Sequence, residues 1–443
     1  MLAATWEALG GASSDLGRLE IVSGGSVFGG PLQVEELMLA SAGATLLAAV
    51  ELAEARTGRA SHARLDQDEV ATAAVSQRHV RLDGASPGAL FLPLSAFLRA
   101  RDGWVRLHGN YPWHRRALLD GLGIADPEHV AAVVRDRDAR DIEDAVVAVG
   151  GCAAAVRTEK AWAATEPGRA AARHRLVARD PGPSGGRPLA AVPAQGALPA
   201  AGLRALDLTR VIAGPVGTRM LAALGADVIR VHRPDRPELP VLALDGGLGK
   251  RWLPLDLRTT AGRAALEAEL RRADVVVCGH RPGALDAFGL HPDALAERHA
   301  HLVCVGLSAW GESGPWGTRR GFDSLVQAAT GIAETVRPAT VEAAPGALPV
   351  QALDHATGYL VAAAALRGLT ERVRTGAAPR ARLALATTAH ALLAAGTRSE
   401  PEFHAVDPTP HLVELDHPDG RLQVVAPPGS LDGRPLRWRR SGQ

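Results

Sequence analysis

Beyond residue 202 the chain alternates short apolar runs with stretches of helical periodicity, and this alternation limits the possible folds more than any other feature. The apolar runs predict strands and the intervening stretches predict helices. Strands are predicted at Leu206–Ile212, Asp227–His232, Trp252–Leu257, Asp274–Cys278 and Leu302–Leu307, and helices at Arg219–Leu224, Thr260–Arg272 and Asp354–Arg372. Alternating strands and helices favour a parallel sheet covered on both faces. We therefore predict an α/β fold with a Rossmann-like parallel sheet in its main domain.

The first half of the chain lacks this alternation and reads as a smaller α+β domain. Glu35–Arg56 and Glu143–Ala164 have the composition of helices rich in small residues, and Asp102–Gly123 reads as a strand, a turn and an amphipathic helix. Between the halves, residues 166–202 are rich in Pro, Gly, Ala and Arg, which is typical of a linker. The predicted units are an N-terminal segment (1–85), the small domain (86–165), the linker (166–202), the Rossmann-like domain (203–393) and a C-terminal tail that packs on it (394–443).

One segment of the N-terminal part is echoed in the main domain. ARTGRASHARL, containing Arg56, aligns with VRTGAAPRARL, containing Arg374, at an offset of 374 − 56 = 318. The same offset places Gln33 on Gln351 and Glu36 on Asp354. Chance similarity between two alanine-rich helices is the alternative, but we interpret the echo as a duplicated helix.

Composition excludes several classes of partner. The 443 residues carry a net charge of +1 and 47% apolar residues, which argues against nucleic acid or an anionic membrane surface. The three cysteines lack metal-ligand spacing, so we expect no metal and a reducing, cytoplasmic environment. The N-terminus lacks the pattern of a signal peptide, and the apolar stretch Tyr359–Leu366 is too short to span a membrane.

Basic residues cluster at the predicted strand ends. Arg233 and Arg258 each follow a strand, where parallel sheets bind ligands, and Arg320 lies in a glycine-rich loop. Together they could form a pocket for a polyanion, or each could be an ordinary surface arginine. The turn AGPVGT does not have the G-x-G-x-x-G spacing of a dinucleotide site, so NAD is not expected.

Four longer segments carry a specific resemblance. LRALDLTRVIAGPVGTRMLAALGADVIRVHRP, GKRWLPLDLRTTAGRAAL, ADVVVCGHRPGALDAFGL and HLVCVGLSAWGESGPWGTRRGFDSLVQAATG occur in the order found in class III CoA-transferases. The chain resembles this family over about Leu203–Leu393. DGWVRLHGNYPWHRRALLDGLG resembles the family's small domain, which normally follows the catalytic helix, so the domain order is rearranged.

The resemblance assigns roles to individual residues. Asp354 in PVQALDHATGYL occupies the position of the family's catalytic aspartate. The family's CoA-contact positions fall on Val211, Ile212, Arg233, Leu255, Arg258 and Arg320. The chain departs from the pattern in two places: the pair Ala287-Phe288 replaces an arginine–methionine pair, and His232 replaces a common glutamate.

What the resemblance implies is a CoA-transferase that moves CoA from an acyl-CoA donor to a carboxylic acid acceptor. Coenzyme A would be a substrate, with no permanently bound cofactor, and the family's interlocked architecture implies a homodimer. An aspartate at a helix start would be held anionic and could use helix N–H donors for oxyanions. On the residues alone, Asp354 could instead be a simple N-cap. Its neighbour His355 could be a base or merely polar, and Glu36 reads as a structural leftover of the duplication.

Two other functions stay open. The first is an acyl-CoA racemase or isomerase of the same fold, which in that branch uses a histidine directly before an aspartate in the motif that reads GFDSL here. Position 322 is Phe, so the imidazole is missing although Asp323 is present. The second is a non-catalytic protein that binds CoA esters.

Overall fold

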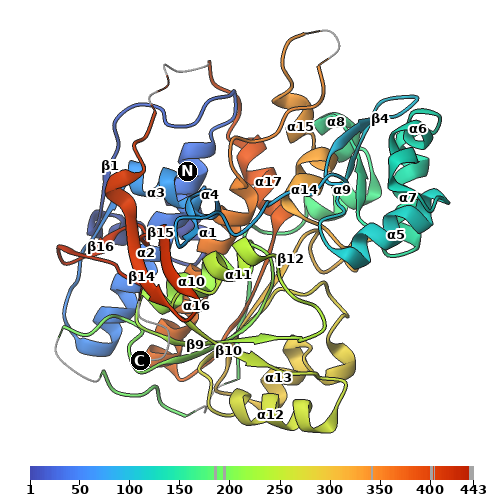
Figure 1. Ribbon diagram of the computed structural model, residues 1–443. Coiled ribbons are helices and arrows are strands. Elements are labelled where there is room, and N and C mark those ends of the chain that lie inside the picture. Colours follow the sequence, from blue (N-terminus) through green and yellow to red (C-terminus); the bar gives the residue numbers. More distant parts are fainter. Residues whose placement is uncertain (184–186, 193–195, 341–342, 400–402, 404, 439–443) are drawn as a thin grey trace.

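The computed structural model describes residues 1–183, 187–192, 196–340, 343–399, 403 and 405–438, and is built around a seven-stranded sheet (Figure 1). The strand order is β10-β9-β8-β11-β12-β13-β7. All neighbours are parallel except β7, which pairs antiparallel with β13. The strands are β7 (Ala178–Asp180), β8 (Arg204–Leu208), β9 (Asp227–His232), β10 (Lys250–Pro254), β11 (Val275–Cys278), β12 (Val303–Ser308) and β13 (Arg380–Ala384). The predicted α/β fold with a mainly parallel sheet is confirmed.

Helices cover both faces of this sheet. α12 (Thr260–Leu270) and α13 (Pro292–Arg298) pack against one face, where Leu206 and Ile229 join their apolar cluster. α10 (Ala213–Ala223) and α16 (Ala352–Thr375) pack against the other, with Val275 and Val303 among their neighbours. Because successive residues of a strand point to opposite faces, strands buried on both sides must be apolar throughout.

A second long helix, α2 (Val34–Thr57), packs on α16 and extends the core beyond the sheet. The Thr45 hydroxyl donates a hydrogen bond of 2.7 Å to the Tyr359 carbonyl, and Glu51 forms ion pairs with Arg367 and Arg374. By length and composition α2 could cross a membrane, a property the sequence reading missed. In the fold, 89% of its most apolar stretch is buried by protein.

α2 and α16 have matching ends, which supports the duplication hypothesis. Both span 24 residues and begin after a glutamine, Gln33 at φ −82° and ψ 58° and Gln351 at φ −72° and ψ 65°. Both end on a left-handed glycine, Gly58 at φ 71° and Gly376 at φ 75°. Each is then followed by a strand and a helix: β2 (Ala63–Asp66) and α3 (Gln67–Ala73), or β13 and α17 (Leu385–Ala394).

The small domain lies to one side of the sheet, away from the N-terminal segment (Figure 1). Its three antiparallel strands have their own apolar core beneath the helices. The elements are β4 (Phe97–Arg99), β5 (Trp104–Leu107), α5 (Pro112–Leu122), α6 (Val130–Arg135), α7 (Ala139–Ala148) and β6 (Ala153–Ala155).

Two sequence predictions about secondary structure are wrong. AGPVGT is not a turn but the beginning of α10, because proline is tolerated in the first turn of a helix. The predicted helix Glu143–Ala164 ends at Ala148, where Gly150 takes a left-handed conformation at φ 78°. Ala153–Ala155 then forms a strand because it pairs with β5, and α8 (Glu159–Ala163) follows.

The segments expected to be a linker and a tail also contribute structure. Within 166–202 lie α9 (Glu166–Ala171) and the edge strand β7. The tail forms β14 (Leu412–His417), β15 (Gly420–Val425), β16 (Ser430–Leu431) and β17 (Arg434–Pro435). β15 pairs with β3 (Arg81–Leu82) and β16 with β2, so these strands extend sheets of the N-terminal segment. Trp438 reaches Arg219 on α10, in the main domain.

Candidate active site

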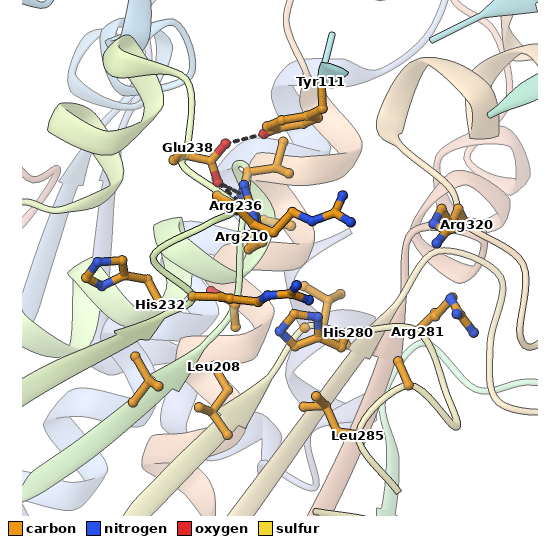
Figure 2. Close-up of a pocket in the computed structure, with 18 of the residues that line it drawn as sticks. Tyr111, Leu208, Arg210, His232, Arg236, Glu238, His280, Arg281, Leu285 and Arg320 are labelled. Atoms are coloured by element: carbon orange, nitrogen blue, oxygen red, sulfur yellow. Dashed lines mark hydrogen bonds and ion pairs between the residues drawn. The ribbon is translucent and has the colours of Figure 1, made fainter. Parts of the chain in front are cut away.

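A cavity of about 500 Å³ lies at the carboxyl ends of the parallel strands. Residues that follow β8, β9, β10, β11 and β12 line it, as do three residues of or next to α5 in the small domain, so both domains form its walls. Parallel sheets commonly bind ligands at this edge. Figure 2 shows Tyr111 of the small domain on one wall, and Arg281 and Arg320 grouped on the side opposite Arg210.

Most residues assigned from the sequence meet in this cavity. Its lining includes Asp354, Val211, Arg233, Leu255, Arg258 and Arg320. Ile212 does not line the cavity; its side chain is buried beside it in the core.

Asp354 is the third residue of α16, and Gln351 is the N-cap residue, so Asp354 is not an N-cap. Its side chain is buried, with 7% of the residue exposed. Its backbone N–H donates a hydrogen bond of 3.0 Å to Oδ2 of Asp323, the first residue of α14 (Asp323–Thr330). This N–H is therefore engaged by a second carboxylate and is not free for an oxyanion.

Burial shifts the ionisation of both carboxyl groups. Burial, together with the negative charge of Asp323, raises the pKa of Asp354 well above its usual range. Burial likewise raises the pKa of Asp323 to about 6, although Gln327 donates a hydrogen bond to it. The expectation that the helix start keeps Asp354 anionic is thus wrong, because desolvation and a like charge outweigh the helix dipole.

The cavity is strongly cationic. Its lining contains eight arginines and three carboxylates, those of Glu238, Asp256 and Asp354, an excess of 8 − 3 = 5 positive charges if all are ionised. The arginines are Arg210, Arg230, Arg233, Arg236, Arg258, Arg281, Arg319 and Arg320. Guanidinium groups in this number suit a ligand with several phosphates.

These arginines are not equally available. Asp235 pairs with Arg233 at 2.5 Å and with Arg258 at 3.3 Å, and Asp256 also pairs with Arg258 at 2.7 Å. Among the described residues, by contrast, no carboxylate pairs with Arg281, whose pKa is lowered by burial and by the nearby Arg320. The two arginines expected to contact CoA at the strand ends are therefore already neutralised by neighbouring carboxylates.

The small domain closes the cavity through aromatic residues that the sequence analysis did not single out. The Tyr111 hydroxyl donates a hydrogen bond to Glu238 (Figure 2), and Glu238 accepts another of 3.1 Å from the Val211 N–H. Val211 has φ 67°, an uncommon conformation for a β-branched residue, which this bond helps to hold. Trp113 stacks on Tyr111 at 4.9 Å, and the Arg236 guanidinium lies 4.4 Å from the Trp113 ring. In the sequence, the aromatic residues of the run NYPWH are the feature that could have indicated this wall of the cavity.

Histidines occupy three different environments. His355 is fully buried outside the cavity, neither ring nitrogen has a described partner, and burial lowers its pKa to about 3. His114 lines the cavity, and both His114 and His108 pack against Phe322, at 5.6 and 3.7 Å between ring centroids. Imidazoles from the small domain thus lie beside Phe322, although the GFDSL motif itself contains none.

Other sequence candidates are also placed. His232 and Phe288, two departures from the family pattern, both line the cavity. Glu36 is exposed at the start of α2. Within the described ranges, no group of three or more His, Cys, Asp or Glu side chains could hold a metal ion.

In comparisons with known proteins, the chain is similar to CoA-transferases. The model of the family described as CoA-transferase family III matches residues 200–410. The chain is 36% identical over 195 residues to "Probable fatty acyl-CoA transferase Rv3272" of Mycobacterium tuberculosis, a match that covers 41% of this chain and 49% of that protein. It is 32% identical over 195 residues to the formyl-CoA:oxalate CoA-transferase of Streptomyces coelicolor, covering 42% and 47%.

Among solved structures, the crystal structure of Rv3272 is similar at 35% identity and a TM-score of 0.42, covering 45% of this chain and 58% of that one. The chain spans about half the length of the curated relatives it matches.

Proposed function

We propose, from the match of residues 200–410 to the model of CoA-transferase family III, that the protein transfers CoA from an acyl-CoA donor to a carboxylic acid acceptor, with Asp354 as the nucleophile. One observation carries the proposal. A buried carboxylate with no cationic partner among the described residues lies in the wall of a cavity that eight arginines line. The arginines suit the phosphates of CoA, and the carboxylate suits a covalent reaction with a thioester.

The reaction consists of four acyl-transfer steps at one side chain. A carboxylate oxygen of Asp354 attacks the thioester carbonyl, the C–S bond breaks, and CoA leaves as a thiolate from an acyl-aspartyl anhydride. The thiolate attacks the side-chain carbonyl of Asp354 and releases the donor acid as its carboxylate. The acceptor carboxylate then attacks the aspartyl-CoA thioester, forming a second anhydride and releasing the thiolate again. Attack of the thiolate on the acceptor's carbonyl gives the new acyl-CoA and restores Asp354.

Asp354 must be ionised for the first attack. Because burial and the charge of Asp323 raise the pKa of Asp354, the ionised fraction of Asp354 grows as the pH rises. Asp323 thus affects the reaction by changing how much of Asp354 is ionised. We therefore expect the acidic limb of the pH–rate profile to show a transfer rate that increases with pH.

The racemase alternative retains one observation in its favour, because His114 lines the same cavity as Asp354. Burial and Arg320 lower the pKa of His114 to about 3, so the ring is neutral at pH 7 and a weak base. We therefore rank transfer above racemisation. The homodimer implied by the resemblance remains part of this proposal.

The test compares wild type, Asp354→Asn and the control Asp120→Asn, which changes an exposed carboxylate of α5. We expect Asp354→Asn to lose CoA transfer while its circular dichroism stays unchanged, and the control to retain transfer. Hydroxylamine added with acyl-CoA should modify Asp354 in the wild type only, as read by peptide mass spectrometry. Undiminished transfer by Asp354→Asn would refute the nucleophile, and solvent deuterium entering the α-carbon of a 2-methylacyl-CoA would favour the racemase.

A further inference from the structure

Trp252 is the most exposed of the Phe, Tyr and Trp side chains in the cavity wall. It lies on β10, the edge strand of the main sheet, and 41% of its surface is exposed. Other large side chains of this part of the chain, such as Leu253, turn to the opposite face and join the core there. An indole that opens into an arginine-lined cavity is placed to contact a ligand rather than to stabilise the core.

The ring is held in position by the neighbouring strand. The guanidinium of Arg230 lies 4.6 Å from the ring centroid, and Arg230 is itself 2% exposed and 3.5 Å from Glu238. The His232 ring meets the indole at 5.1 Å and 76°. The register of β9 and β10 pairs Trp252 directly with Arg230. The departure at position 232 thus supplies an aromatic neighbour for Trp252, and the indole is preorganised before any ligand binds.

The place of Trp252 in the cavity determines which part of a ligand it can meet. The Asp354 N–H donates to Asp323, which begins α14, the helix that follows β12, whereas Trp252 lies on β10. Four strand intervals separate β10 from β12, and at about 4.8 Å each they span roughly 19 Å. A ligand whose reacting carbonyl lies at Asp354 therefore presents its remote end to Trp252.

The charged residues on the strands around Trp252 indicate what chemistry the remote end of the ligand has. Arg233 and Arg258 follow β9 and β10, the two strands that hold the indole and its support, and both line the cavity. To meet a phosphate they would exchange it for their present carboxylate partner, Asp235. An aromatic face beside guanidinium groups is the combination that binds a nucleotide, since the ring stacks on the base and the cations meet the phosphates. In an acyl-CoA, the end remote from the thioester is an adenosine phosphate.

We propose that Trp252, supported by Arg230 and His232, is the stacking platform for the adenine ring of the CoA carrier. The inference rests on the proposed function for the orientation of the ligand. It adds a residue that distinguishes the nucleotide half of the carrier from the pantetheine half.

The test measures binding without catalysis. Calorimetry with free CoA and with adenosine 3′,5′-bisphosphate, the nucleotide half alone, is applied to wild type, Trp252→Ala, Trp252→Leu and Trp252→Phe. We expect Ala and Leu to weaken both ligands by a similar factor, roughly 5- to 150-fold, as found when a stacking aromatic is removed. Phe keeps a ring and should stay within a few-fold of wild type. Melting curves establish whether each variant is folded. If Trp252→Ala does not fold, Trp252→Leu takes its place in the comparison.

The outcomes separate this inference from the proposed function. Unchanged affinity of folded Ala or Leu variants for both ligands would overturn the stacking role and leave the transferase proposal in place. Loss of CoA affinity with unchanged affinity for the nucleotide half would also overturn it, because the indole would then contact the pantetheine arm. A wild-type protein that binds neither ligand would overturn the proposed function, and this inference with it.

Discussion

Replacing Asp323 with Asn tests the carboxyl pair at the start of α16. Asp323 is 2% exposed and titrates with a pKa raised by burial to about 6, from an ordinary value of 3.8. Its charged neighbours are Asp354 on α16 and Arg106 on β5. Asn has almost the same shape and can still accept the hydrogen bond from the Asp354 N–H, but it carries no charge.

The magnitude follows from linkage between protonation and folding. Between pH 4 and 6 the folded protein keeps a proton on Asp323 that the unfolded chain releases, so this group's stabilisation is full below pH 4 and is lost as the pH rises through 6. Two pKa units correspond to about 3 kcal/mol. The stability of Asp323→Asn relative to wild type should therefore improve by about 3 kcal/mol between pH 4 and pH 7. A change in hydrogen bonding caused by the amide is the same at both pH values and cancels in this difference.

Urea unfolding at the two pH values, followed by circular dichroism, measures this difference, and Asp120→Asn is again the control. The same variant should move the acidic limb of the transfer rate to lower pH, because Asp354 loses the like charge that helps to raise its pKa. A stability difference that is equal at pH 4 and pH 7, together with an unmoved rate profile, would show that the two carboxyl groups do not interact as described.

Two further predictions concern the cavity walls. Tyr111→Phe removes the hydrogen bond to Glu238 that joins the small domain to the main domain, so we expect a loss of roughly 1.5–3 kcal/mol in urea unfolding and a higher KM for acyl-CoA. Unchanged stability would mean that the contact contributes little to closing the cavity. Asp235→Asn releases Arg233 and Arg258 from their shared partner, so calorimetry should show CoA binding tighter by up to about five-fold. Weaker binding would indicate that Asp235 orients these arginines for the ligand.

The elements that the sequence predicts best are those whose signal is local. β9 has the predicted bounds, and α2 and α16 lie within three residues of theirs, because apolar runs and glycine stops mark them. β6 was missed because three alanines favour a helix in isolation, and only pairing with β5 makes them a strand.

The candidate site shows the same division. The family pattern correctly selects residues that lie together, since Asp354 and most of the predicted contact residues line one cavity. It does not reveal Tyr111 and Trp113, which precede the main domain by about a hundred positions and reach the cavity only through domain packing. Nor does it reveal that Asp323 faces Asp354, since a carboxyl pair formed by two helices is a tertiary contact.

During synthesis of the chain, α2 emerges from the ribosome long before α16, the helix that covers it. α2 ends at residue 57 and α16 begins at residue 352, so 351 − 57 = 294 residues separate them. A ribosome that adds about 5–20 residues per second needs roughly 15–60 s to cover this distance. During that interval the nascent chain exposes the apolar surface of α2 that α16 later covers. We therefore expect expression to depend on chaperones that shield α2, and fragments that end before α16 to aggregate.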